Sequence, residues 1–143
     1  MNQPSSTRVL TYLFFNGQCE QAMAFYCDKL DATINFSMRF DQSPEAMPSG
    51  VLQEGFEQKI MHAELQIGAT AIFASDGIDD KTTMGGYSLA LRTDSETDAK
   101  RYFSALAEGG KIDMPLAPTF WASLYGMVTD QFGIAWMVTV PGE

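Results

Sequence analysis

The sequence predicts an α+β fold made of two strand–helix–strand–strand–strand units. Several short segments alternate apolar and polar residues with the period of a half-buried strand, and two segments place apolar residues on one helical stripe. The order of these segments repeats. A shift of 77 residues places Ala22 on Ala99 and Phe25–Tyr26 on Tyr102–Phe103 without a gap. Because a helix covers one face of such a sheet, we expect the other face to meet the second unit or a ligand.

The first unit is predicted to begin with a strand over residues 9–16 and a helix over residues 17–32. The apolar stripe of this helix consists of Cys19, Ala22, Met23, Tyr26 and Leu30. A second strand is predicted over 33–40, because Ile34, Phe36, Met38 and Phe40 alternate there with polar residues.

Residues 41–58 contain two prolines and two glycines without periodicity, which predicts a long loop. Loops of this length in compact domains are often lids or binding loops. Two further strands are predicted over 60–67 and 70–75, with a turn at Gly68 between them.

The second unit repeats this order. A strand is predicted over 87–94 and a helix over 95–110, where Asp94 or Ser95 can cap the start and Ser95 with Asp98 fits a capping box. The remaining segments are a short edge strand within 111–120 and two strands over 122–130 and 133–140.

Composition limits the classes of partner. The chain has 143 residues, which is the size of one domain, and carries a net charge of −9. An acidic chain without a basic cluster repels phosphate, so we expect no nucleic acid or membrane partner. The N-terminus has no apolar signal segment.

The two cysteines, Cys19 and Cys27, are predicted to lie about 12 Å apart on one helix, too far for a disulfide. Free thiols suit the cytoplasm, where we expect the protein.

The only histidine lies in the alternating segment "IMHAELQI", residues 60–67. Alternation places His62 and Glu64 on one face of the strand. Three interpretations are open: a hydrogen-bonded structural pair, a pair that contacts a ligand or transfers a proton, and two ligands of a metal. A metal would require further ligands, and the chain has no second histidine.

Four segments carry a resemblance to a known family: residues 15–26, 54–58, 60–68 and 119–138. They resemble the vicinal oxygen chelate superfamily of glyoxalases, bleomycin resistance proteins and dioxygenases, and within it the PhnB-like branch. The resemblance implies a glyoxalase-like curved mixed sheet with a cleft. It implies a single glyoxalase-like domain over 1–143, with βαβββ units at 9–76 and 87–140, and a homodimer.

The metal-dependent members bind their ion through His, Gln or Glu on the first and fourth strands of each unit. Carried over by position, the resemblance places these four sites at Thr11, Ile72, Ser88 and Met137. None of the four is a good ligand for such an ion. We therefore expect no metal and no cofactor.

Alternation then assigns side chains to the cleft. The first unit is expected to contribute Thr11, Leu13, Phe15, Asn35, Ser37, Arg39, His62, Glu64 and Gln66. The second is expected to contribute Ser88, Ala90, Arg92, Trp121, Tyr125, Met127, Thr129, Ala135 and Met137. A few polar groups among aromatic and sulfur-containing side chains are typical of small-molecule sites.

Within this lining, His62 and Glu64 are the candidate catalytic residues. Ligand-binding candidates are Arg39, Arg92, Trp121, Tyr125 and Met137. The two arginines could bind a carboxylate or phosphate, or form surface ion pairs. The aromatic residues could stack on a ligand or fill the core.

The leading hypothesis is a metal-independent protein that binds a small organic molecule and, in one interpretation, modifies it. The alternative is a non-catalytic protein that sequesters a drug, as bleomycin resistance proteins do. A metal-dependent lyase or dioxygenase is disfavoured by the four positions above. A 3-demethylubiquinone methyltransferase, the name often attached to this branch, is disfavoured because no glycine-rich cofactor turn follows the first strand.

Overall fold

The computed structural model describes residues 6–142, which form two compact units. The first unit holds the residues up to Cys27 together with Asp31–Lys81, and the second holds Asp28–Leu30 and the residues from Thr82 onward. Each unit has one helix and a four-stranded mixed sheet, so the predicted α+β class and the repeated order of elements are confirmed. No helix of residues 6–142 is long and apolar enough to span a membrane.

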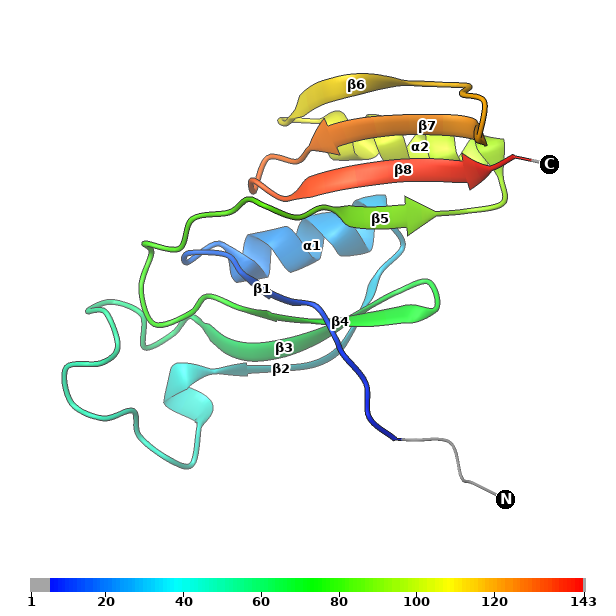
Figure 1. Cartoon of the computed structure of the whole chain (residues 1–143). Coiled ribbons are helices and arrows are strands. Elements are labelled where there is room, and N and C mark those ends of the chain that lie inside the picture. The colour runs from blue at the N-terminus through cyan, green and yellow to red at the C-terminus, as the bar shows by residue number, and fades with distance from the viewer. Residues whose placement is uncertain (1–5, 143) are drawn as a thin grey trace. The chain divides into compact units, whose positions relative to one another are not determined.

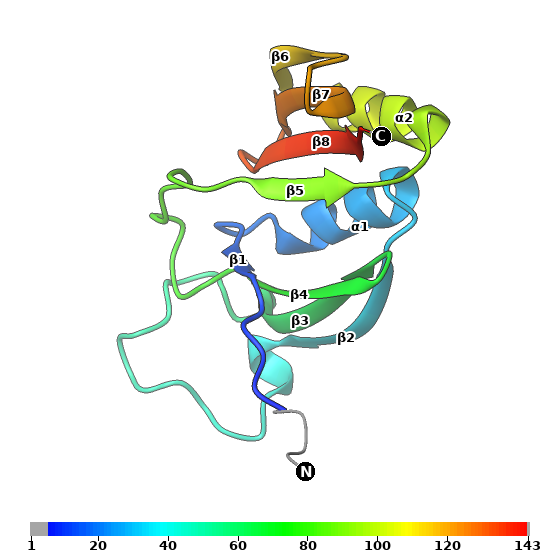
Figure 2. The same ribbon diagram turned by 45° about the vertical axis from the view of Figure 1, so that its right-hand side comes forward.

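The first unit follows the predicted order. Its elements are β1 (Tyr12–Phe14), α1 (Cys19–Lys29), β2 (Thr33–Arg39), a 3₁₀ turn (Phe40–Gln42), β3 (Ile60–Ile67) and β4 (Thr70–Ser75). The strands lie in the order β1-β4-β3-β2, and only the pair β1–β4 is parallel (Figure 1). After the 3₁₀ turn, the predicted loop runs to β3 without helix or strand and extends away from the sheet (Figure 2).

The second unit has the same plan. Its elements are β5 (Leu89–Arg92), α2 (Glu96–Ala107), β6 (Lys111–Ala117), β7 (Ala122–Thr129) and β8 (Ala135–Pro141), in the sheet order β5-β8-β7-β6. The predicted cap of α2 is confirmed, because the Ser95 hydroxyl accepts a hydrogen bond from the backbone N–H of Asp98 at 3.1 Å. Both views show α2 lying along β7 and β8 (Figures 1 and 2).

The core of the first unit lies between α1 and one face of its sheet. The predicted helical stripe is confirmed, because Cys19, Ala22, Met23, Tyr26 and Leu30 are all buried. The sheet contributes the buried residues Leu13, Ala63, Leu65, Ile72 and Ala74. Burial of these residues provides most of the free energy that holds α1 on the sheet. It also leaves the opposite face of the sheet without a helix of its own unit.

Both cysteines are free thiols, as predicted. Cys19 is buried in the first turn of α1, and this burial, with the nearby carboxylates of Asp76 and Glu20, raises the pKa of its thiol well above the usual range. Burial also raises the pKa of Cys27. Because the thiolate is the nucleophile, neither cysteine is suited to nucleophilic catalysis at neutral pH.

Candidate functional site

The structure places His62 and Glu64 on the face of β3 that turns away from α1. The intervening Ala63 and the following Leu65 are buried on the α1 side, whereas His62 and Glu64 are half-buried. The alternation of β3 therefore holds from residue 62 onward, and both polar side chains lie on the helix-free face of the first sheet.

Three aromatic side chains lie around His62 on this face, and a fourth stacks on one of them. We call Tyr12, Phe14, Phe36, His62 and Phe73 together the aromatic face. The imidazole centroid lies 5.1 Å from the ring of Phe73, 5.7 Å from Tyr12 and 6.1 Å from Phe36. Phe14 stacks on Tyr12 at 5.0 Å. Tyr12, Phe14 and Phe36 keep 41%, 39% and 47% of their surface exposed, so these rings are accessible to a ligand.

His62 and Glu64 have different hydrogen-bond partners. The hydroxyl of Tyr12 lies 3.0 Å from Nδ1 of His62. The Asn35 amide donates to the Glu64 carboxylate at 2.8 Å and to the Gln66 side-chain oxygen at 3.3 Å. A hydrogen bond between His62 and Glu64, one interpretation of the sequence, is therefore not formed. The partner of His62 instead comes from β1, two strands away, and the partner of Glu64 comes from the neighbouring strand β2.

A β-bulge in β2 corrects the predicted face of that strand. Ile34 pairs with Leu65 and Phe36 pairs with Glu64, so Asn35 is an extra residue in the ladder. An extra residue reverses the alternation that follows it. Phe36 and Met38, predicted to pack under a helix, therefore share the face of His62. Ser37, predicted in the cleft, pairs instead with buried Ala63.

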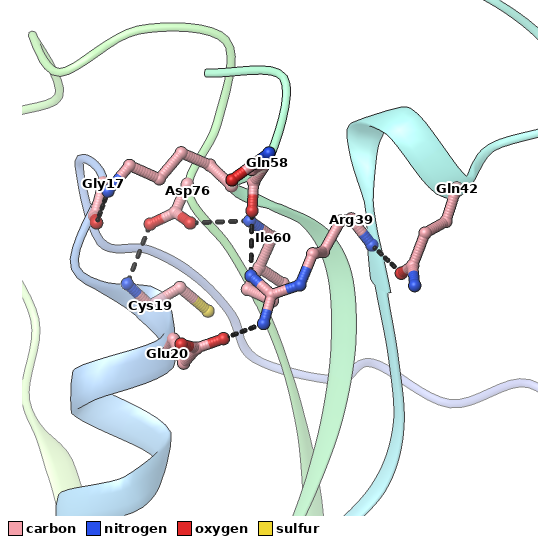
Figure 3. A network of polar contacts seen from close by, with 9 residues as sticks. Gly17, Cys19, Glu20, Arg39, Gln42, Gln58, Ile60 and Asp76 are labelled. Carbon is pink, nitrogen blue, oxygen red and sulfur yellow. Dashed lines mark hydrogen bonds and ion pairs between the residues drawn. The ribbon is translucent and has the colours of Figure 1, made fainter. Parts of the chain in front are cut away.

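Arg39 does not join His62. A second register shift separates Met38, which pairs with His62, from Arg39, which pairs with Ile60. The guanidinium of Arg39 donates to the backbone carbonyl of Gln58 at 2.8 Å and to the carboxylate of Glu20 in α1. Figure 3 shows these contacts at the start of α1. The hydrogen bonds of Arg39 therefore join β2 to α1 and to the loop, and they do not bring its guanidinium to His62, with which it was expected to line the cleft.

The predicted face of β1 is also wrong by one residue. Leu13 and Phe15, expected in the cleft, are buried with 2% and 3% of their surface exposed, whereas Tyr12 and Phe14 lie on the aromatic face. In β4, Ile72 is likewise buried. Phe73 lies on the face away from α1, because Phe73 pairs with Tyr12 and Glu64. Both strands are apolar on their two faces, so alternation alone could not decide which residues are buried.

The predicted residues of the second unit lie on the face of its sheet away from α2. The neighbours of Tyr125 and Met137 along their strands, Leu124 and Trp136, are buried on the opposite side. The Tyr125 hydroxyl donates to the Met137 sulfur at 3.4 Å, and the Trp121 ring lies 5.5 Å from that of Tyr125.

Arg92 pairs in register with Thr139 at the end of β5. It is exposed and makes no ion pair with any described residue. The structure thus brings Trp121, Tyr125 and Met137 together. Arg92 lies two strands from Tyr125 in the same row of the sheet, because Thr139 pairs with both residues.

The side chains of the first and fourth strands do not suit a divalent cation. The open side of β1 and β4 carries Tyr12 and Phe73, and in the second unit Ala90 pairs with Met137. Within residues 6–142, no three His, Cys, Asp or Glu side chains lie close enough to hold a metal ion. Among the described residues, these positions therefore offer no set of donors for the ion that the metal-dependent members bind.

Comparison with known proteins identifies relatives over nearly the whole chain. The family model described as 3-demethylubiquinone-9 3-methyltransferase matches residues 7–139. Protein YjdN of Escherichia coli K12 is 36% identical over 137 residues, which cover 90% of this chain and 92% of that protein.

Solved structures share the fold. Protein PA1353 of Pseudomonas aeruginosa is 41% identical with a TM-score of 0.83, over 96% of this chain and 100% of that one. The PhnB protein of Bacillus cereus is 26% identical with a TM-score of 0.76, over 94% of this chain and 99% of that one. A glyoxylase/bleomycin resistance protein/dioxygenase domain of a Frankia species shares the fold alone. It is 15% identical with a TM-score of 0.64, over 98% of this chain and 100% of that one.

Proposed function

We propose that this chain, a member of the PhnB-like branch of the vicinal oxygen chelate superfamily, binds a small molecule. The family model that matches it is the one described as 3-demethylubiquinone-9 3-methyltransferase. The ligand is a planar organic molecule, and the aromatic face of the first unit binds it. The observation that supports this most directly is the arrangement of half-exposed aromatic rings around the only histidine.

The composition of the aromatic face favours a neutral, flat ligand. Aromatic rings stack on one another with centroids about 4.5–7 Å apart and gain about 0.5–1.5 kcal/mol per pair beyond area burial. Among the strand residues of the first unit the only arginine or lysine is Arg39, whose guanidinium bonds Glu20 and Gln58. The charged group that remains on this face is the Glu64 carboxylate. An anionic ligand would therefore be repelled rather than paired.

Methyl transfer requires a site for a methyl donor, and the turn after the first strand does not fit one. The backbone N–H of Cys19 at the start of α1 donates to the Asp76 carboxylate at 2.8 Å. The carbonyl of Gly17 accepts a hydrogen bond from the Lys59 ammonium at 3.0 Å. Polar groups that could hold a cofactor at this turn are therefore bonded within the chain, and we propose binding rather than methyl transfer.

We further propose that binding needs no metal. Purified protein is expected to contain less than about one-tenth of an equivalent of Zn, Ni, Mn or Fe per chain, because a stable site needs at least three suitable ligands. Elemental analysis after dialysis without chelator measures this. About one equivalent of any of these metals, retained through gel filtration, would contradict metal independence.

Removing a ring from the aromatic face is expected to weaken binding of a flat probe. Phe36→Ser should lower the affinity for coumarin about 5- to 30-fold, because it removes a half-exposed ring 6.1 Å from His62. Titrations followed by amide chemical shifts measure the affinity. Ile34→Ser is the matched control, because Ile34 lies on the same strand with 43% exposure but pairs with Leu65 on the other face. Equal losses in both variants would rule out the aromatic face as the binding surface.

The same face contains the groups that could act on a ligand. His62 and Glu64 are residues of the types that transfer protons in enzymes. A protein that modifies its ligand would use such groups, whereas a protein that only sequesters a drug, as bleomycin resistance proteins do, needs binding alone. Turnover assays on any compound that binds would distinguish the two functions. Roles for Arg92, Trp121, Tyr125 and Met137 in ligand binding, the homodimer and the cytoplasmic location stay predictions.

A further inference from the structure

We propose that Tyr12 is a positioning residue that fixes the tautomer of His62, so that the imidazole meets a ligand as a hydrogen-bond donor through Nε2. The ligand is then a planar aromatic molecule with an acceptor oxygen, such as a ring carbonyl. This inference rests on the proposed function, namely ligand binding by the aromatic face, and adds the chemical class of the ligand.

The Tyr12–His62 hydrogen bond carries the inference. The phenol oxygen lies 3.0 Å from Nδ1, which is hydrogen-bonding distance. A neutral imidazole holds its proton on one nitrogen and accepts with the other. Burial raises the pKa of the Tyr12 hydroxyl, so this group keeps its proton at neutral pH and can donate it to Nδ1. The imidazole proton then occupies Nε2.

The Nε2 atom is available to a ligand. Among residues 6–142, the Tyr12 hydroxyl is the only group that forms a hydrogen bond with the His62 side chain. The other side chains near His62 include Phe36 and Met38 from β2, Phe73 from β4 and Glu64 on β3 itself. Phe36 and Phe73 are rings without a conventional hydrogen-bonding group, and the thioether of Met38 is only a weak acceptor. The Glu64 carboxylate accepts its hydrogen bond from Asn35. A ligand oxygen would satisfy Nε2–H while the ligand plane contacts the rings.

The tautomer can be measured without any ligand. The chain has one histidine, so long-range ¹H–¹⁵N correlations of imidazole report His62 alone. At about pH 8.5, where histidine side chains are ordinarily neutral, we expect the Nε2–H tautomer with Nδ1 hydrogen-bonded. Tyr12→Phe should shift the Nδ1 resonance toward that of an unbonded nitrogen. Tyr87→Phe, which removes the hydroxyl of a similarly exposed tyrosine in the other unit, should leave it unchanged.

Two results would overturn the role of Tyr12. One is an Nδ1–H tautomer in the unaltered protein, because His62 would then donate to Tyr12. The other is a His62 spectrum that Tyr12→Phe leaves unchanged. The amide spectrum of Tyr12→Phe checks that the variant is folded. If the variant is not folded, the tautomer measured in the unaltered protein tests the role of Tyr12.

The ligand class is tested with two bicyclic probes of similar size. Coumarin offers a ring carbonyl, whereas indole offers an N–H donor and no acceptor oxygen. We expect coumarin to bind more tightly and to shift the His62 ring nitrogens. Tyr12→Phe should weaken coumarin about three- to tenfold, the effect of one hydrogen bond, and leave indole unchanged. Indole binding as tightly as coumarin would overturn the ligand class, whereas failure of both probes would count against the proposed function and leave the tautomer result intact.

Discussion

Replacing Asp130 by alanine is expected to lower the free energy of unfolding by about 3–5 kcal/mol, because it leaves several buried donors without a partner. The Asp130 carboxylate is 3% exposed. One oxygen accepts the backbone N–H groups of Phe132 at 2.9 Å and Ile134 at 3.1 Å, and the other accepts the indole N–H of Trp136 at 2.9 Å. The side chain thus fixes the turn between β7 and β8 and one large core ring.

Urea unfolding followed by circular dichroism measures this loss. Asp94→Ala is the control, because Asp94 is exposed and its carboxylate has no partner among the described residues. The control should change stability by less than about 0.5 kcal/mol. A loss below about 1 kcal/mol for Asp130→Ala would show that water or nearby groups satisfy the exposed donors.

The elements of the fold could be predicted because their patterns are local. The stripe from Cys19 to Leu30 covers about three turns of consistent helical spacing. Ser95 caps α2 through a backbone group three residues away. Such signals need no knowledge of which strand lies next to which. For the same reason β3 could be assigned correctly from His62 onward, because small or aliphatic Ala63 and Leu65 alternate with polar residues.

The aromatic face could be predicted only in part. β1 and β4 are apolar on both faces, so the sequence does not reveal that Tyr12 and Phe73 pair on the open side. The bulge at Asn35 depends on pairing with β3, and a one-residue change of register moves every later side chain to the other face. Tyr12, Phe14, Phe36 and Phe73 were therefore missed. The hydroxyl of Tyr12 was the one signal, because a tyrosine in an apolar strand needs a polar partner.

Arg39 illustrates a different limit. Its positive charge suggested a partner for an anionic ligand, but its partners are Gln58 in the loop and Glu20 in α1, each 19 residues away along the chain. Contacts between elements are set by tertiary packing and leave no local pattern. The polar network at the start of α1, which also contains Asp76, could be identified only from the structure (Figure 3).

Asp76→Ala is expected to destabilise the first unit by about 2–4 kcal/mol, because two buried backbone donors lose their acceptor. The Asp76 carboxylate is 1% exposed. Its two oxygens accept the N–H groups of Cys19 and Ile60, each at 2.8 Å, and so hold the start of α1 to the start of β3 (Figure 3). His62 follows Ile60 by two residues, so this contact also anchors the strand that presents the histidine.

Two measurements test this role of Asp76. Urea unfolding should show the loss of stability, and Asp80→Ala, an exposed aspartate of the same segment, should stay within about 0.5 kcal/mol of the unaltered protein. Labelling with a maleimide in native buffer should be slow at Cys19, because burial and the Asp76 and Glu20 charges raise the pKa of its thiol. Asp76→Ala removes one of those charges and loosens the first turn of α1, so labelling at Cys19 should accelerate at least about tenfold relative to Cys27. Unchanged stability together with unchanged labelling would show that α1 is held by its apolar stripe alone, without the carboxylate that joins it to β3.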